Sequence, residues 1–342
     1  MPGTSCTVFY PDGGVSDVQR LQMVTTGGGN THVIAVKGNF DDCQTGLKQL
    51  FASSDFAAAM NEKGCVPSSA NSINFGRLVP QVVYYFSAYA DMVGQGAVAP
   101  GETVNFVVPT GNFGNILAAY YARAMGLPVG KLICASNRNH VLTDFFESGV
   151  YDTRRLFFKT ISPSMDILVS SNLERLLFEA ADRDGSLIAT WMRQMKETGT
   201  YAVGEQRLEW LHDVFTAGYA DDEQTRAEIQ RTWQQERYLM DTHTAVAHHV
   251  LRSYREETGD NTPAVVVSTA SPYKFAADVL SALKGSDFVQ GRDAFTCSQL
   301  LEDMTGMPVP MQVKALRSLP VRHTALCEKE AMDAAVLQAL RG

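Results

Sequence analysis

Residues 104–128 read VNFVVPTGNFGNILAAYYARAMGLP, and they pass from an apolar run through a short loop into a helical pattern. Val104 to Val108 form a near-continuous apolar run, which is typical of a strand buried on both faces of a parallel sheet. A helix is predicted from Asn115 to Met125, because Gly126 and Pro128 can end it there. This order of strand, loop and helix indicates an α/β fold.

The same alternation continues on both sides of this stretch. Thr7 to Tyr10 and His32 to Val36 have strand patterns, and the segment between them has a helical pattern that Ser16 can cap. Lys131 to Ala135 and Ala264 to Val267 are predicted as further buried strands. Strands that alternate with helices at short spacing predict parallel sheets flanked by helices, so the predicted fold class is α/β.

Residues 172–235 have a different character. They carry many charges and amphipathic helical periods, with almost no strand pattern. We therefore predict a helical insert over 172–235 within the α/β fold.

The composition argues against several classes of function. The 342 residues carry a net charge of −8 with no basic run, so we expect no nucleic-acid partner. No apolar stretch approaches the ~18–20 residues of a membrane span, and the N-terminus lacks the features of a signal peptide. The six cysteines form no CxxC, and the seven histidines add no metal-ligand spacing. These features predict a cytoplasmic protein with reduced thiols, no metal site and no membrane contact.

The loop between the strand and the helix has the residues of an anion site. A helix N-terminus has free N–H groups and about half an elementary positive charge, so it attracts phosphate or carboxylate. Gly111 and Gly114 let backbone amides approach such an anion without a Cβ in the way. The loop matches neither GxGxxG nor GxxxxGK[ST]. The residues alone leave two interpretations open, an anion-binding loop and an ordinary tight turn.

A second candidate lies in ANSINFGRLVPQ, residues 70–81. Asn74 and Arg77 are three residues apart near the start of a predicted helix, so they can share a face. The guanidinium of arginine offers a fork of donors that suits phosphate. An Asn or Ser helix cap followed by a surface arginine is the simpler interpretation of these residues taken alone.

Two further stretches lie at predicted element ends. VVVSTASPYKF, residues 265–275, ends a strand in small hydroxyl residues, where Ser268 or Thr269 can bond a heteroaromatic nitrogen, although ordinary turn chemistry also explains them. Lys274 follows in the first turn of a predicted helix, and nothing nearby indicates a Schiff-base role. DTHTAVAHHV, residues 241–250, places His243 at the start of a capped helix without an HExxH pattern, so we expect no metal there.

In combination, six segments resemble threonine synthase, a pyridoxal-phosphate (PLP) enzyme of fold type II, which is the tryptophan-synthase-β-like fold. The resemblance runs from YPDGGVSDVQRLQM, residues 10–23, to about residue 285. The six segments are NSINFGR, VPTGNFGN, ASNRNHVL, SMDILVSSNLERLLFE, DTHTAVA and STASPYKF.

The resemblance implies a reaction and a cofactor. The family converts O-phospho-L-homoserine and water to L-threonine and phosphate, with PLP as the electron sink. Thr269 matches the neutral hydroxyl residue beside the pyridine nitrogen of PLP. The loop that cradles the PLP phosphate is matched by Gly111, Asn112, Phe113, Gly114 and Asn115.

The resemblance also implies a site for the phosphate of the substrate. Asn71, Ser72 and Arg77 match the residues that hold it in the family. His140 departs from an acidic residue that is common at its position, and we attach no functional role to it. A relative that uses PLP for another elimination, such as the dehydration of serine or threonine, would not need the cation of Arg77.

Two segments that the resemblance implies are missing from these 342 residues. The family carries its Schiff-base lysine in a segment resembling HGPTLAFKD, and a second segment resembling TSGDTG follows it. We expect an N-terminally truncated threonine synthase with no catalytic lysine, and we expect this chain alone to be inactive. The alternative is a noncatalytic threonine-synthase-like protein that binds phosphate-bearing ligands. The oligomeric state stays open.

The domain organisation follows from the same resemblance. Residues 1–65 are expected to be the remainder of a smaller α/β domain, and residues 66–285 a large PLP-binding domain that includes the helical insert. Residues 286–342 are expected to form a C-terminal helical extension.

Overall fold

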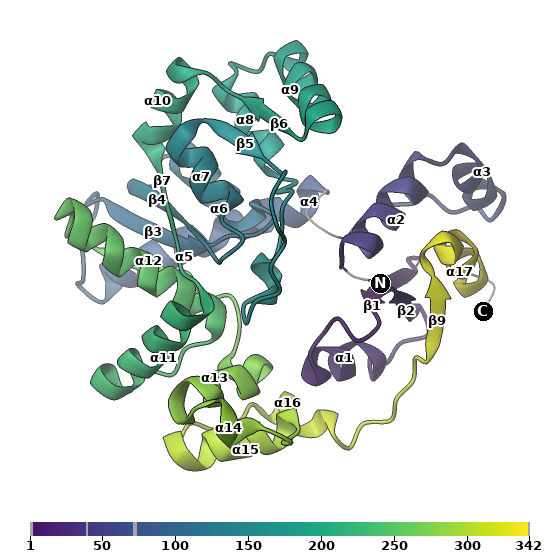
Figure 1. Cartoon of the computed structure of the whole chain (residues 1–342). Helices are drawn as coiled ribbons and strands as arrows, with labels where there is room; N and C mark the ends of the chain where they lie inside the picture. Colours follow the sequence, from purple (N-terminus) through teal and green to yellow (C-terminus); the bar gives the residue numbers. More distant parts are fainter. Residues whose placement is uncertain (1–2, 39, 71–73, 341–342) are drawn as a thin grey trace. The chain divides into compact units, whose positions relative to one another are not determined.

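The computed structural model describes residues 3–38, 40–70 and 74–340, and its elements form two compact units (Figure 1). The first unit consists of Met1–Ser68, Tyr273–Leu280 and Val289–Gly342, and the second consists of Ser69–Pro272 and Ser281–Phe288. Over the described ranges, none of the helices combines the length and apolar composition needed to cross a lipid bilayer.

The first unit is built on a parallel sheet of three strands in the order β1-β2-β9. Its strands are β1 (Cys6–Pro11), β2 (Thr31–Lys37) and β9 (Ala325–Glu328). Ser16 caps the first helix as predicted, because its hydroxyl accepts the N–H of Gln19 while the Gln19 side chain accepts the N–H of Ser16. The helices of this unit are α1 (Asp17–Val24), α2 (Phe40–Ala52), α3 (Ser54–Glu62), α15 (Ala294–Thr305), α16 (Met311–Leu316) and α17 (Met332–Ala339).

The C-terminal segment, for which the sequence predicts a helical extension, also contains a strand. Strand β9 lies near its end and pairs with β2, which brings residues 289–342 into one unit with residues 1–68. The strand has only four residues and is largely exposed, so it lacks the apolar run that would reveal it in the sequence. The domain boundaries predicted from the sequence stay predictions.

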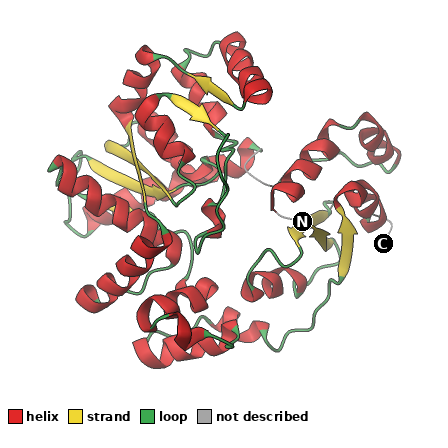
Figure 2. Cartoon of the chain, in the orientation of Figure 1, coloured by secondary structure: helices red, strands yellow, loops and turns green. Residues whose placement is uncertain are grey.

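The second unit contains the parallel sheet that the opening stretch predicts, in the order β7-β4-β3-β8. Figure 2 draws strands in yellow and helices in red. Its strands are β3 (Val104–Pro109), β4 (Val129–Ser136), β7 (Phe215–Tyr219) and β8 (Ala264–Val266). A separate antiparallel pair joins β5 (Val150–Asp152) and β6 (Thr200–Ala202).

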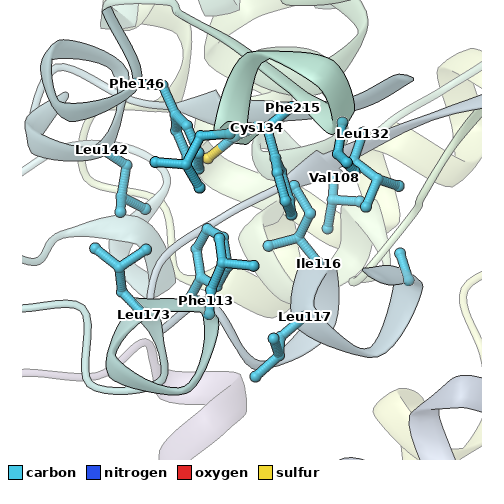
Figure 3. Close-up of a cluster of buried hydrophobic side chains, with 14 of the residues drawn as sticks. Val108, Phe113, Ile116, Leu117, Leu132, Cys134, Leu142, Phe146, Leu173 and Phe215 are labelled. Carbon is cyan, nitrogen blue, oxygen red and sulfur yellow. The ribbon is translucent and has the colours of Figure 1, made fainter. Parts of the chain in front are cut away.

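Helices cover both faces of this sheet, which explains why β3 is apolar along its length. Phe106 and Val108 belong to a cluster with α6, and Figure 3 shows Val108 beside Ile116 of that helix. Val107 belongs to a second cluster, with α12 on the other face. All six residues of β3 are buried. The α-helices assigned wholly or largely to this unit are α4 (Phe75–Leu78), α5 (Val82–Gly94), α6 (Gly114–Ala124), α7 (Val141–Ser148), α8 (Leu173–Ala180), α9 (Gly185–Thr198), α10 (Glu205–Val214), α11 (Asp222–Glu236), α12 (Thr242–Thr258) and α14 (Ser286–Val289).

Short irregular elements complete the description. Pro80 lies in the 3₁₀ turn η1 (Val79–Gln81), which separates α4 from α5, because proline interrupts the hydrogen bonding of an α-helix. A second 3₁₀ turn, η2 (Pro163–Met165), precedes α8. Helix α13 (Ala276–Lys284) contributes residues to both units.

The predicted insert is mostly helical but not wholly so. It holds α8 to α11, and it also supplies β6 and β7. Strand β7 pairs with β4 over five residues, from Phe215 to Tyr219, and is therefore part of the main sheet. Its sequence FTAGY alternates apolar residues with polar or small ones over only five positions, which is a short signal between helical segments, so the expectation of a helical insert is wrong for this strand.

A buried carboxylate ties α11 to α12. Glu228 on α11 is 1% exposed, and its Oε1 lies 2.5 Å from Nη2 of Arg231 and 2.7 Å from Nδ1 of His248. Burial raises the pKa of Glu228, but hydrogen bonds from His248, His249 and Arg231 outweigh burial and hold it well below its usual range. The carboxylate therefore stays ionised and stabilises the packing of the two helices.

We expect Glu228→Gln to lower the free energy of unfolding by about 3 kcal/mol at neutral pH, because it removes the charge from a buried ion pair. Because the pKa of Glu228 is lower in the folded state than in the unfolded state, its ionisation stabilises the fold above about pH 4.3, the pKa of the unfolded state. This stabilisation is lost as the pH falls below that value. The difference in the free energy of unfolding between wild type and variant should therefore become smaller at acidic pH. Urea denaturation at a series of pH values measures it.

Glu256→Gln is the matched control. Its carboxylate is 64% exposed and pairs with Arg252 on the same helix, so we expect a change of less than about 1 kcal/mol. Equal losses in the two variants would contradict the role given to Glu228.

Candidate functional site

The loop after β3 forms a concave arrangement of backbone N–H groups. Phe113 is in the left-handed conformation with φ of 64° and is the N-cap residue of α6, which begins at Gly114. Consecutive residues in left-handed and helical conformations turn their N–H groups toward one side, and this geometry binds anions. Within the described part of the chain, no acceptor takes a hydrogen bond from the backbone N–H groups of residues 111 to 116. We call residues 111–116 the anion loop.

The carbonyl groups of the anion loop are held by a second loop, residues 170–172. The Ser170 hydroxyl donates to the carbonyl oxygen of Gly111 at 2.7 Å. The backbone N–H and side-chain Nδ2 of Asn172 both donate to the carbonyl oxygen of Asn112, at 3.2 and 2.8 Å. The carbonyl oxygens of Gly111 and Asn112 are therefore satisfied, while the backbone N–H donors of the loop are left for another group.

Phe113, rather than one of the glycines, has the left-handed backbone conformation in the anion loop. Its ring is buried, and the ring centroid lies 6.1 Å from that of Phe146 and 6.0 Å from that of Phe215 (Figure 3). A left-handed residue with a side chain costs roughly 1–2 kcal/mol, which burial of the aromatic ring offsets. Nothing in the sequence signals a left-handed phenylalanine, because the conformation depends on distant partners.

Gly111 has a role that the sequence does not reveal. A Cβ atom at this position would lie 2.5 Å from the carbonyl oxygen of Ser164 and 3.4 Å from Cα of Met165. The absence of a side chain lets the anion loop pack against the backbone of η2. Gly114 is buried as the first residue of α6.

The two asparagines of the anion loop have different surroundings. Asn115 Oδ1 lies 2.6 Å from the hydroxyl of Tyr85, whose pKa is raised far above its usual value by burial. Asn112 Oδ1 is buried and has no partner within the described residues. A buried amide oxygen of this kind calls for a donor from outside the protein, such as an ordered water or a hydroxyl on a ligand.

Thr269 follows β8, the strand next to β3. Because β3 and β8 run parallel, with Val107 opposite Val266, Thr269 and the anion loop both follow the carboxyl ends of neighbouring strands. The side chain of Thr269 is exposed, and the hydroxyl of its neighbour Ser268 lies 3.0 Å from that of Thr244 on α12. The structure thus brings Thr269 to the same edge of the sheet as residues 111–116.

Arg77 lies in α4, which packs near α6 through Phe75 and Tyr121, with ring centroids 6.0 Å apart. Its side chain is exposed, and the guanidinium makes no hydrogen bond or ion pair with the described residues. Asn74 caps this helix by accepting the N–H of Gly76 at 2.9 Å, which gives it a structural role. The predicted partners of Arg77, namely Asn71 and Ser72, lie outside the described residues.

A buried polar network that sequence reasoning missed holds the segment between β5 and α8. The carboxylate oxygen Oδ1 of Asp166 accepts bonds from Nδ2 of Asn137 at 2.8 Å and of Asn139 at 3.1 Å, and from the Thr160 hydroxyl at 2.7 Å. Burial raises the pKa of Asp166, and these bonds partly offset the rise. The network pins η2 to the end of β4, and its only sequence signal is the polar pair at 137 and 139.

The start of α6 has the donors of an anion site. Within the described residues, its first N–H groups have no acceptor, so they can donate to an anion. In the ranges that the structure describes, no three His, Cys, Asp or Glu side chains gather in a way that could hold a metal ion.

Comparisons with known proteins show which proteins this chain is similar to. The family described as "Threonine synthase, C-terminal" matches residues 244–336. The chain is 45% identical over 278 residues to human threonine synthase-like 1, covering 81% of this chain and 37% of that protein. It is 42% identical over 275 residues to the threonine synthase of Pseudomonas aeruginosa, covering 80% of this chain and 56% of that protein.

A solved structure matches nearly the whole chain. PLP-bound threonine synthase from Brucella melitensis is 35% identical, with a TM-score of 0.81, and the match covers 99% of this chain and 66% of that chain. The chain therefore spans 37% to 56% of the length of the two curated relatives and about two thirds of this structural relative.

Proposed function

Because this chain belongs to the threonine synthase family of PLP enzymes with fold type II, we propose that it provides the PLP-binding and substrate-phosphate sites of a threonine synthase. The reaction of the whole enzyme is the conversion of O-phospho-L-homoserine and water to L-threonine and phosphate. The observation that carries the proposal is the anion loop, in which six consecutive N–H groups, those of residues 111 to 116, have no protein acceptor within the described residues.

The anion loop binds the phosphate of PLP. Its N–H groups and the positive end of α6 supply donors and partial charge, and Ser170 and Asn172 keep the carbonyl groups of Gly111 and Asn112 engaged elsewhere. When bound, PLP supplies the electron sink for the carbanion chemistry at the substrate. The hydroxyl of Thr269 orients the ring through its nitrogen and, being neutral, leaves that nitrogen largely unprotonated.

Arg77 binds the phosphate of the substrate. A guanidinium without an internal partner within the described residues offers several N–H donors to phosphate oxygens. The same residue argues against the competing proposal of a serine or threonine dehydratase, because the substrates of such an enzyme carry no phosphate. Asn71 and Ser72 are proposed to share this site with Arg77.

Catalysis also needs the Schiff-base lysine that the family carries in a segment unlike any in these 342 residues. We therefore propose that this chain alone binds ligands without turning them over, since losing such a group costs several orders of magnitude in rate. Lys274, the lysine beside the Thr269 segment, belongs to the first unit. A cytoplasmic location remains part of the proposal.

Titration of the purified chain with PLP, followed by absorbance, tests the proposal. We expect saturable binding that inorganic phosphate competes away, because both anions use the same N–H groups. Borohydride should trap no covalent adduct, and O-phospho-L-homoserine should yield no threonine. PLP binding that phosphate does not affect would contradict the anion loop, and robust turnover would contradict the inactivity of the chain.

A noncatalytic phosphate-binding protein is the second candidate. The anion loop favours it, because its N–H groups need no lysine in order to hold a phosphate. Adding the purified chain to a threonine synthase that lacks its own anion loop separates the two proposals. Restored turnover would favour the enzyme, and unchanged inactivity together with tight phosphate binding would favour the binding protein.

A further inference from the structure

The N-terminus of α12 contains a buried pair of ionisable side chains outside the site described above. Asp241 is the N-cap residue, and its Oδ1 accepts the N–H of His243 at 2.8 Å and that of Thr244 at 3.4 Å. The same oxygen lies 3.1 Å from Nδ1 of His243. The side chains of Asp241 and His243 are 0% and 3% exposed. The carboxylate therefore fixes the imidazole ring in one orientation.

The other ring nitrogen of His243 contacts a distant backbone group. The N–H of Ser164 donates to Nε2 of His243 at 3.2 Å. Nε2 is therefore the acceptor of this hydrogen bond, while Nδ1 faces Oδ1 of Asp241. His243 thus connects a buried carboxylate to the backbone of η2.

Ser164 in turn faces the anion loop. Its carbonyl oxygen would lie 2.5 Å from a Cβ at Gly111, so the two backbones are in direct contact. Because interiors are closely packed, a shift of Ser164 must displace Gly111 or open a void beside it. Ser170 and Asn172 hold the carbonyl side of the loop, and the turn at Ser164 limits its position from another direction.

We propose that His243 is a positioning residue for the anion loop, and that it acts by holding Ser164 against Gly111. Asp241 orients the ring, Nε2 holds the N–H of Ser164, and the carbonyl of Ser164 sets where the first N–H group of the loop lies. The inference rests on the proposed function only for the identity of the bound anion, since the contacts themselves are independent of any ligand.

Two substitutions separate the contacts of His243. In His243→Asn the side-chain amide reaches the place of Nδ1, so it keeps the contact with Asp241 and loses the one with Ser164. In His243→Gln the amide oxygen reaches the place of Nε2, so it can still accept the N–H of Ser164. Both variants keep a polar group in the buried site. His249→Asn is the control, because His249 lies on the same helix and its side chain contacts Glu228 and Arg252 instead.

The Gly111 amide resonance in protein labelled with ¹⁵N-glycine reports the position of the loop without any ligand. We expect His243→Asn to move this resonance, and His243→Gln and His249→Asn to leave it near its wild-type position. A resonance unmoved in His243→Asn, or moved equally in the Asn and Gln variants, would overturn the proposal. The wild-type histidine ring spectrum adds a test that needs no variant, because a proton on Nε2 at neutral pH would also overturn it.

Binding of inorganic phosphate provides the functional readout. We expect His243→Asn to weaken phosphate binding roughly 10-fold, as loss of a residue that orients a ligand-binding group commonly does, and His243→Gln to stay within about twofold of wild type. Equal affinities in wild type and His243→Asn would count against the proposal. If wild type itself fails to bind phosphate, the proposed function fails, and the Gly111 resonance still decides the role of His243.

Discussion

Replacing Gly111 with alanine is expected to weaken PLP binding by on the order of 100-fold, because a displacement of about 1 Å in a binding group can have an effect of this size. The new Cβ would lie 2.5 Å from the carbonyl oxygen of Ser164, a distance at which one backbone must move. Neither partner can move freely. The carbonyl of Gly111 is held by Ser170, and the N–H of Ser164 is held by His243. Titration with PLP and with inorganic phosphate measures the loss.

Gly185→Ala is the matched control for this substitution. Gly185 is the first residue of α9, and a Cβ there meets no atom within 4 Å. We expect unchanged PLP affinity and equal or slightly higher stability, since alanine is a better helix former than glycine. If Gly111→Ala and Gly185→Ala bind PLP equally well, then the close packing of the loop on η2 has no role in binding.

The parts of the fold that could be predicted are those whose signal is local. Strand β3 is buried on both faces, so its five apolar positions identify it without reference to any partner. The cap at Ser16 and the break at Pro80 likewise depend on neighbouring residues. Strands β7 and β9 were missed because each exists through pairing with a strand far away in the chain.

The features of the candidate site also fall into those with a local sequence signal and those that depend on tertiary contacts. A glycine-containing loop after a buried strand predicts N–H donors at the start of a helix, and the structure supplies them in residues 111–116. The left-handed conformation of Phe113 and the contact between Gly111 and Ser164 follow from tertiary packing. No spacing in the sequence encodes them, because they join segments that are about 30 to 100 residues apart.

The start of α12 connects the two sides of the proposed PLP site. His243 accepts the N–H of Ser164, which contacts the anion loop. The hydroxyl oxygen of Thr244 lies 3.0 Å from that of Ser268, the residue before Thr269. Asp241 accepts hydrogen bonds from both residues, so we expect a change at this one buried carboxylate to affect the phosphate side and the pyridine side of the proposed site together. On this proposal, the motif DTHT is a shared support for the two sides.

Replacing Arg77 with alanine should weaken binding of O-phospho-L-homoserine to the chain roughly 10- to 100-fold while PLP affinity changes less than about twofold. A hydrogen bond to a charged group contributes about 1.5–3 kcal/mol, and each 1.4 kcal/mol is a factor of ten in affinity. The guanidinium has no partner to release within the described residues, so the loss reflects the ligand contact. Isothermal titration at physiological salt measures both affinities.

Three comparisons make the result of Arg77→Ala specific. Arg77→Lys should recover only part of the affinity, because an ammonium group cannot bond two phosphate oxygens as a guanidinium fork does. Arg123→Ala removes the same charge from an exposed position in the last turn of α6, at the end of this helix away from the anion loop. It should change the affinity for O-phospho-L-homoserine little. L-homoserine, which lacks the phosphate, should bind wild type and Arg77→Ala equally weakly. If Arg77→Ala and Arg123→Ala lose the same affinity, the effect is one of net charge, and Arg77 does not distinguish a phosphorylated substrate from a free hydroxy amino acid.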